Sequence, residues 1–298
     1  MRVKNPKCRG GILSYRRERS VPISGHPGLS SSDNLMEDAA TLRERALTAS
    51  KDELATLIHH PASDVLLAVV QNPSLDEAQL TLLLERKDLP AELFEQIVRR
   101  KALLKNYRVK RAIVFHHRAP RLVAMRLLRD LYLMDLAQFT LSPTVVVDLK
   151  RQAEEQLIAR LPQLPLGQKV TLARRGPARA AGALLAEGHP QILAVVLDNA
   201  YLTESQILKA LSREKLPEAA LIAVGHHRKW SFSYNVRIAL VRHHRTPLGI
   251  VLGILPDLTL NDLRDLASPG IVSDSLRKYL QAEVARRTRV SRKRAPEQ

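Results

Sequence analysis

The sequence predicts an all-α fold, an α-solenoid in which about six helix pairs stack into a right-handed superhelix. Between about residues 37 and 287, apolar residues recur at spacings of three and four, as in LDEAQLTLLLERKDLPAELFEQIVRRKALL (75–104). Prolines interrupt this pattern roughly every 10 to 30 residues, which predicts short helices joined by tight turns. The chain also resembles itself, as repeat proteins do.

The strongest self-similarity appears when the chain is shifted against itself so that Asn72 meets Asn199. We call this displacement the module shift. Under it the triplet HHR at 116–118 meets the same triplet at 243–245, and the match runs on without a gap as far as Pro247. The sequence therefore predicts two homologous modules of about 125 residues each.

A shorter period lies inside each module. VLLAVVQNP (65–73) and VKRAIVFHH (109–117) stand 44 residues apart, and ILAVVLDNA (192–200) and VRIALVRHH (236–244) repeat that spacing. A weaker copy, VTLARRGPA, occupies residues 170–178. A period of this length is typical of paired helices that bury their apolar faces against their neighbours.

These observations divide the chain into five parts. They are a disordered basic N-terminal segment (1–36), helical-repeat module 1 (37–162), connecting helices (163–187), helical-repeat module 2 (188–285) and a disordered basic C-terminal tail (286–298). The one β-like run, TVVVDL (144–149), has no partner strand, so we expect it to be helical.

Charge is concentrated at the two ends. The net charge is +17; residues 1–36 hold seven Lys/Arg against two acids, and residues 286–298 hold six against one. Solvated tails are one interpretation, and arms that attract a polyanion are the other.

Cysteine usage and hydropathy exclude several classes of protein. The single cysteine, Cys8, excludes a disulfide framework and a four-cysteine zinc site. No stretch approaches 18 uninterrupted apolar residues, and no apolar segment follows the basic N-terminus. We therefore expect no membrane span and no signal peptide, and a cytoplasmic location.

The repeat units resemble a known family. Val236, Arg237, Ala239, Leu240, Thr246 and Pro247, with Val65, Ala68, Asn72 and Pro73, match the repeats of bacterial leucine-rich repeat variant and HEAT-like proteins. The resemblance covers about residues 60–285, and it implies an α-solenoid of HEAT-like helix pairs that serves as a binding surface. The iron–sulfur cysteine cluster that the variant can carry is excluded by the single Cys8.

The paired histidines follow short helices. His116 and His243 stand where the sister repeats have Asn72 and Asn199. We expect the first histidine of each pair to be a helix C-cap in the left-handed conformation, where Asn and His are enriched. A neighbouring helix should approach closely at Ala112, and likewise at its counterpart in module 2.

The second histidine and the arginine of each pair are not explained by capping. The two HHR turns should lie on the same edge of the superhelix, and His226-His227-Arg228 should form a third basic turn on that edge. A cationic strip of this kind suits phosphate or carboxylate groups. Histidines near their ordinary pKa should strengthen the binding of a polyanion as the pH falls from about 7.5 to 6.

Metal and catalytic sites are not expected. No His-x-x-x-His pair, nucleophile elbow or phosphate-binding glycine loop occurs, so we predict no metal, no cofactor, no catalytic residue and no small-molecule substrate. Asp130 and Asp135, with their counterparts Asp257 and Asp262, are interpreted as N-caps and first-turn charges rather than as a general acid and base.

The insert HHRKWSFSYN (226–235) combines the only tryptophan, Trp230, with several cations. HEAT-like alkylpurine DNA glycosylases, which hold DNA in a basic concave face, share this architecture and use Trp, Tyr and Asp residues. The insert is either an inter-repeat loop pinned by one buried ring or a nucleic-acid contact in which the ring stacks on a base.

The function predicted from the sequence is a non-catalytic helical-repeat scaffold that binds a macromolecular partner with an acidic surface. The alternative is a nucleic-acid-binding solenoid, and a glycosylase-like enzyme is a distant third. The residues expected to bind the partner are His117, Arg118, Arg228, Lys229, Trp230, His244 and Arg245.

Overall fold

The computed structural model describes residues 31–294, with side chains described for residues 40–289. Within this range the chain is entirely α-helical, with short 3₁₀ turns and no strand. The all-α prediction is therefore confirmed for the described residues. Predictions made for residues 1–30 and 295–298 lie outside them.

The first half of the described chain has nine α-helices and two 3₁₀ turns. They are α1 (Ser31–Thr48), α2 (Lys51–Leu57), α3 (Ser63–Gln71), α4 (Glu77–Leu83), α5 (Ala91–Arg99), η1 (Leu103–Lys105), α6 (Tyr107–Phe115), α7 (Arg121–Leu127), η2 (Leu128–Asp130), α8 (Leu133–Leu141) and α9 (Val147–Arg160).

The second half follows the same order after one more short turn. It comprises η3 (Leu161–Gln163), α10 (Leu166–Arg175), α11 (Ala178–Glu187), α12 (Pro190–Val196), α13 (Glu204–Leu211), α14 (Glu218–His226), η4 (Trp230–Phe232), α15 (Tyr234–Arg242), α16 (Leu248–Ile254), η5 (Leu255–Asp257), α17 (Leu260–Leu266) and α18 (Asp274–Arg294). From α3 and α12 onward, the module shift carries the first residue of each helix onto the first residue of its counterpart.

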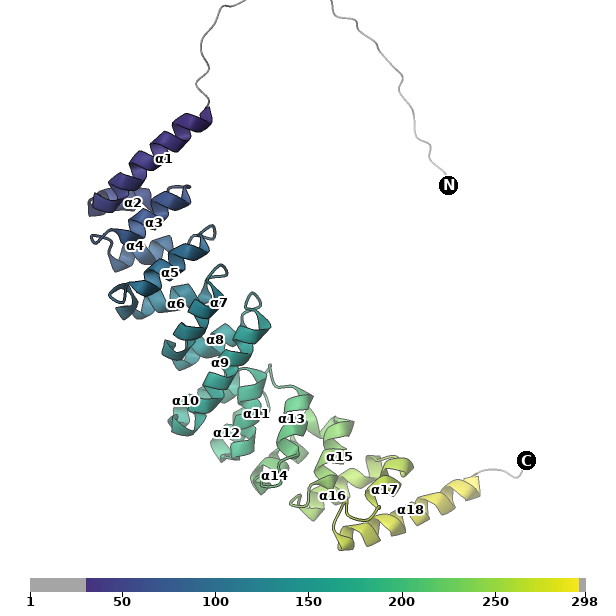
Figure 1. Cartoon of the computed structure of the whole chain (residues 1–298). Coiled ribbons are helices and arrows are strands. Elements are labelled where there is room, and N and C mark those ends of the chain that lie inside the picture. The colour runs from purple at the N-terminus through teal and green to yellow at the C-terminus, as the bar shows by residue number, and fades with distance from the viewer. Residues whose placement is uncertain (1–30, 295–298) are drawn as a thin grey trace, which may run out of the picture.

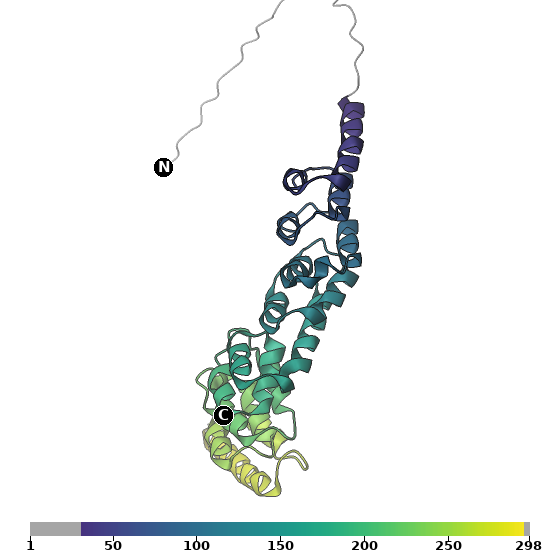
Figure 2. The same ribbon diagram turned by 90° about the vertical axis from the view of Figure 1, so that its left-hand side faces the viewer.

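The helices follow one another in chain order along an elongated array, with α1 at one end and α18 at the other (Figure 1). Turned by 90°, the array shows two layers of helices (Figure 2). Helices two apart in the sequence pack side by side, as α1 does with α3 and α11 with α13. The apolar core runs between the layers along the array rather than forming one central cluster.

Prolines mark where helices begin. Pro90, Pro120, Pro177, Pro217 and Pro247 are the N-cap residues of α5, α7, α11, α14 and α16, each with a φ between −56° and −72°. Proline suits this position because its φ is fixed near −65° and the first amides of a helix have no intrahelical partner. This agrees with the short helices and tight turns expected from the sequence.

Polar side chains join each repeat to the preceding one. The Asn72 amide donates to the Ala46 and Ala49 carbonyls (2.8 and 3.0 Å), and its oxygen accepts from the Ser74 backbone N–H (2.7 Å). The counterparts, with the same three distances, are Asn199, Ala173, Gly176 and Tyr201. These contacts satisfy carbonyls that the end of a helix leaves without a partner.

At the end of each half, arginine side chains also donate hydrogen bonds to backbone carbonyls of an earlier turn. Arg160 donates to the carbonyls of Arg129 and Leu131 (2.6 and 2.7 Å). Arg287, which the module shift relates to Arg160, donates to those of Leu255 and Leu258 (both 2.8 Å).

Tyrosines form a further recurring tie. Tyr107 donates to the Asp135 carboxylate and accepts from the Tyr132 backbone N–H (3.0 Å). Tyr234 makes the same pair of contacts with Asp262 and the Thr259 N–H (3.1 Å). Burial, followed by the hydrogen bond to Asp135, raises the pKa of Tyr107 to about 12.

The four aspartates that were expected to be N-caps or first-turn charges have these roles only in part. Asp135 and Asp262 stand in the first turns of α8 and α17. Asp130 caps no α-helix and pairs instead with Lys110 (2.6 Å), and Asp257 pairs with Arg237 (3.2 Å).

Three expectations about local structure are corrected. His116 and His243 are C-caps, but their φ values are −76° and −79°, and no described residue other than glycine has a positive φ. Both cap residues are therefore extended rather than left-handed. Helix α9 begins only at Val147, so the first part of TVVVDL is a turn.

The third correction concerns the chain ends. Residues 286–294, expected to be a disordered tail, continue helix α18, and residues 31–36 belong to α1. Arg286 and Arg287 both pair with Glu283 (2.7 Å), and Arg287 also reaches carbonyls of the preceding turn. Basic residues here therefore stabilise a helix rather than forming a solvated tail.

Candidate binding grooves

Two open grooves of the same construction lie in the two halves of the chain. The N-terminal groove, of about 780 Å³, lies between α4 and α6; the C-terminal groove, of about 580 Å³, lies between α13 and α15. The N-terminal groove is lined by Thr81, Leu84, Glu85, Lys87, Arg108, Arg111, Ala112, Phe115, His116 and His117, together with Thr144. The C-terminal groove is lined by Leu208, Leu211, Ser212, Glu214, Asn235, Ile238, Ala239, Arg242, His243 and His244, which the module shift relates one by one to the first ten.

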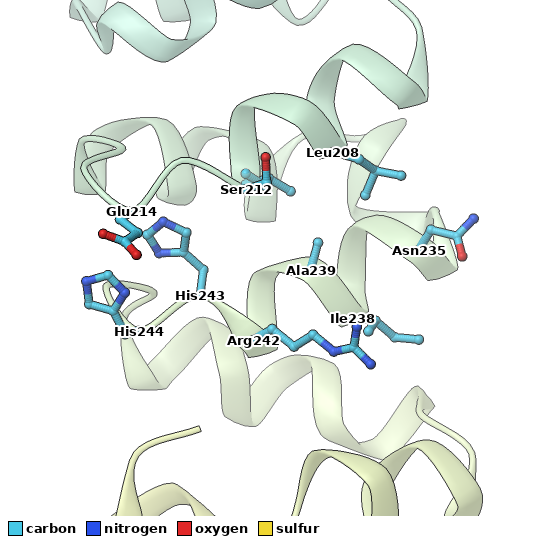
Figure 3. A pocket seen from close by; sticks show the side chains of 10 residues that line it. Leu208, Ser212, Glu214, Asn235, Ile238, Ala239, Arg242, His243 and His244 are labelled. Atoms are coloured by element: carbon cyan, nitrogen blue, oxygen red, sulfur yellow. The ribbon is translucent and has the colours of Figure 1, made fainter. Parts of the chain in front are cut away.

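The alanines form part of the groove walls. In the C-terminal groove, Ala239 stands between a cluster of Glu214, His243 and His244 at one end and Asn235 at the other (Figure 3). Ala112 and Ala239 are both only half-buried. Both also pack against the apolar core, so the expectation that a neighbouring helix approaches closely at these alanines stays a prediction.

The first histidine of each pair closes one end of its groove. The His116 ring accepts the Arg118 backbone N–H at Nδ1 (3.1 Å) and contacts the Arg86 carbonyl through Nε2 (2.6 Å). His243 makes the same two contacts, with the Arg245 N–H (3.2 Å) and the Arg213 carbonyl (3.0 Å). Both ring nitrogens are occupied, so these histidines join repeats as the asparagines do.

Burial lowers the pKa of His116, and the neighbouring His117 and Arg118 act in the same direction, although the Arg86 carbonyl opposes them. His116 is therefore less charged between pH 7.5 and pH 6 than a histidine with its ordinary pKa. Its part in the expected strengthening of polyanion binding over that interval is correspondingly smaller.

The N-terminal groove carries free cations. Lys87 and Arg108 are exposed and form no ion pair with a described residue. Arg111 is paired with Asp135 (2.8 Å) and lies 4.9 Å from the centre of the Phe115 ring. Glu85 is the only acid in the lining.

The C-terminal groove is close to neutral. The positions of Lys87, Arg108 and Arg111 are taken by Glu214, Asn235 and Ile238. Its one lysine or arginine is Arg242, whose charge is balanced by that of Glu214. The two grooves therefore have equivalent positions but different charge.

A middle groove lies between these two, against α9, α11 and α13. It is lined by Ile158, Arg179, Gly182, Ala183, Gln206, Lys209, Ala210 and Arg213. Arg179 pairs with Glu154 (3.1 Å), whereas Lys209 and Arg213 are exposed and form no ion pair with a described residue. Together the three linings hold seven Lys/Arg (three, three and one) against two Asp/Glu (one, none and one).

Four of the residues expected to bind a partner lie at the ends of the two equivalent grooves. His117 and His244 line them, each ring stacked on its neighbouring histidine at 4.9 and 5.1 Å. Arg118 and Arg245 are exposed in the turns that follow.

The remaining three expected residues lie elsewhere. The turn with Arg228 and Lys229 precedes η4 and the start of α15, whereas the HHR turn follows the end of that helix. The third basic turn is therefore not on the same edge, because the whole of α15 separates the two. Arg228 is exposed and near Asp198 (3.5 Å).

Trp230 is a structural residue. Its ring is 5% exposed, and its Nε1–H donates to the Leu197 carbonyl (2.9 Å). The Lys229 ammonium lies 4.1 Å from the centre of the ring. A buried ring has no free face for a base, so the expected partner contact by Trp230 is corrected to an inter-repeat tie.

Five groove-wall cations that form no ion pair with a described residue were not predicted from the sequence: Lys87, Arg108, Lys209, Arg213 and Arg242. No residue pattern marks them, because their exposure depends on how the helices pack. The HHR motifs predicted only residues at the ends of the grooves.

No group of three or more His, Cys, Asp or Glu side chains within the described range is placed to hold a metal ion. None of the helices described is both long and apolar enough to cross a bilayer. Scans of the chain against protein-family models, curated proteins and solved structures find no match.

Proposed function

We propose that this protein is a non-catalytic, cytoplasmic α-helical repeat scaffold that binds an extended acidic segment of a partner protein along its three grooves. One observation carries the proposal: the same ten positions line an open groove in each half of the chain. Repeat proteins use such recurring surfaces to hold extended partners.

The proposal includes the architecture expected from the sequence. We infer an α-solenoid of HEAT-like helix pairs, related to the leucine-rich repeat variant family, that arose by duplication of one module. It is supported by the helix order, the Asn72 and Asn199 ties and the groove linings, all of which recur under the module shift.

Charge favours an acidic partner. Lys87, Arg108, Lys209 and Arg213 are exposed cations with no ion pair among the described residues, and they lie in two of the three linings. Carboxylates of a bound segment would pair with them, and arginine's planar fork suits such contacts. His117, Arg118, His244 and Arg245 would extend the contact at the groove ends, whereas Arg228 and Lys229 would add only peripheral attraction.

Nucleic acid is the alternative partner, because phosphates would also pair with these cations. The buried ring of Trp230 removes the stacking contact that favoured it. The same observation removes the main support for a glycosylase-like activity.

The experiment compares two variants of the full chain with equal loss of charge. The groove variant is Arg108→Gln, Lys209→Gln, Arg213→Gln; the control is Lys101→Gln, Arg129→Gln, Arg174→Gln, which changes exposed cations outside the three linings. Fluorescent poly-glutamate peptide and a single-stranded oligonucleotide are titrated at low and high salt.

We expect the groove variant to lower the affinity for the peptide about tenfold at low salt and the control to change it less than about twofold. Equal loss in both variants would show that attraction depends on net charge alone, and would overturn the proposal. A parent chain that binds the oligonucleotide through the groove cations but not the peptide would instead support the alternative.

A further inference from the structure

A second kind of pocket adjoins the C-terminal groove. It has a volume of about 350 Å³ and lies between the end of α15, α16 and the start of α18. Its apolar walls come from Val241, Leu248, Val251, Leu252, Val272 and Leu276. Arg242, His243 and His244 line both this pocket and the groove, so they form a shared wall. Volumes near 300 Å³ suit small ligands.

The matching place in the first half is built differently. There Arg121 of α7 pairs with Asp148 of α9 (2.9 Å), which joins the two helices across their surface. The module shift puts Leu248 and Ser275 at these two positions, and they cannot form an ion pair. The side chains at the pocket therefore remain apolar and open: Leu248 is 59% exposed and Tyr279 is 50% exposed.

Two polar residues of the pocket are specific to the second half, whereas His243 and His244 have identical counterparts in the first. Arg242 replaces Phe115, and Thr246 replaces Ala119. Arg242 is exposed and has no ion pair with a described residue. Asp274 at the start of α18 is already paired with Arg277 (2.8 Å), and the charge of Arg242 helps to lower the pKa of Asp262 on α17.

Thr246 is a further residue of the pocket wall that has no threonine counterpart in the first half. Its Oγ1 is buried without a hydrogen-bond partner, the one such side-chain atom found among the described residues. A buried hydroxyl without a partner is unfavourable, and native structures usually supply one from protein, water or ligand. Thr246 lines the pocket, but its Oγ1 is buried beneath the surface and does not face a ligand there.

We propose that this pocket binds a small carboxylate that carries an apolar chain or ring. The apolar part packs between Leu248, Val251 and Leu276, and the carboxylate accepts hydrogen bonds from the Arg242 guanidinium. A free monocarboxylic acid and the apolar C-terminal residue of a peptide both have this chemistry. The proposal goes beyond the scaffold function and does not depend on it.

The test uses the full chain and octanoate as the probe, with titration calorimetry and saturation-transfer NMR. Octanol, which lacks the charge, is the matched neutral probe. A short peptide ending in leucine, with a free or an amidated C-terminus, distinguishes a peptide source from a free acid. We expect octanoate to bind with a stoichiometry of one, and octanol to bind more weakly.

Two double variants exchange the features of the halves. Leu248→Arg with Ser275→Asp installs the ion pair of the first half and should abolish octanoate binding. The control, Arg121→Leu with Asp148→Ser, should leave it unchanged, because that site lacks a counterpart of Arg242. Thermal unfolding of each variant verifies that it is folded.

Arg242→Gln should weaken octanoate about tenfold or more and leave octanol unaffected, since a charged hydrogen bond is lost. Octanoate binding that survives the Leu248→Arg, Ser275→Asp change, or that is equal to octanol binding, would overturn the proposal. Failure of both octanoate and the free-terminus peptide to bind the parent would do the same. Preference for the peptide with the free terminus would identify the source as a peptide end.

Discussion

The N-terminal and C-terminal grooves are lined by ten pairs of residues that the module shift relates, but the pairs are of two kinds. Four pairs are identical: Leu84 and Leu211, Ala112 and Ala239, His116 and His243, and His117 and His244. The leucines are buried and the first histidines tie one repeat to another. The six pairs that differ include every lysine, arginine and acid of the two linings. Residues that hold helices together are thus identical in the two grooves, whereas those that set the charge of the groove differ.

The largest effect should come from the asparagine ties, which the two halves share. Asn72→Ala and Asn199→Ala each remove a buried amide and leave two carbonyls and one N–H without partners. We expect a loss of about 3 kcal/mol in the free energy of unfolding for each, because buried groups without partners are costly. Urea denaturation measures it.

The matched control for the asparagine ties is Gln71→Ala, which alters an exposed neighbour whose amide contacts Gln96 at 3.3 Å. It should change the free energy by less than about 0.5 kcal/mol. A large loss for one asparagine and none for the other would show that the two halves are not equivalent at this position.

A smaller effect is expected at Thr246, where the halves differ. Thr246→Val keeps the shape of the side chain and removes the hydroxyl that has no partner. We expect a gain of about 1 kcal/mol in the free energy of unfolding without ligand. The comparison, Ala119→Val, introduces valine at the equivalent position of the first half, where no hydroxyl is lost. Equal gains in both would mean that the hydroxyl is not the cause.

The smallest effect concerns pH. The pKa of His116 is lowered in the folded protein, so below its ordinary value of 6.5 the unfolded chain binds a proton more readily than the folded one. This residue should therefore reduce stability as the pH falls from about 6.5 toward its folded pKa, and contribute no pH dependence above that. The effect should be about a few tenths of a kcal/mol, because the ring is only partly buried.

His116→Asn places the sister-repeat residue at this position and removes the titrating ring. Urea denaturation at pH 7.5 and at pH 5.5 should show a smaller difference for this variant than for the parent. His117→Asn, which changes the adjacent exposed ring, is the comparison. If the pH dependence were the same in the parent and in His116→Asn, the buried ring would not be its source.

Local sequence patterns predicted much of the fold. Apolar spacings and prolines determine where short helices begin, because these properties act within a few residues. They failed at residues 286–294, which continue helix α18 and in which Arg287 donates to the carbonyls of Leu255 and Leu258. A contact between residues so far apart in the chain leaves no mark in local composition.

The candidate site was only partly predictable for the same reason. The HHR motif pointed to the ends of the grooves, where His117 and His244 lie. The motif did not indicate Lys87 or Lys209, because neither lysine belongs to a recognisable sequence motif. Their role depends on which face of a helix remains uncovered, and that is decided by packing.

The sequence by itself determined that the chain is helical and that it resembles itself under the module shift. Only the tertiary structure decided what the related positions do. Asn72 and His116 became ties between repeats because carbonyls of the preceding repeat lie within reach of their side chains. Trp230 became a buried tie rather than a contact surface because the Leu197 carbonyl faces its ring nitrogen. Composition cannot fix such outcomes, since a side chain's role depends on the groups that folding brings beside it.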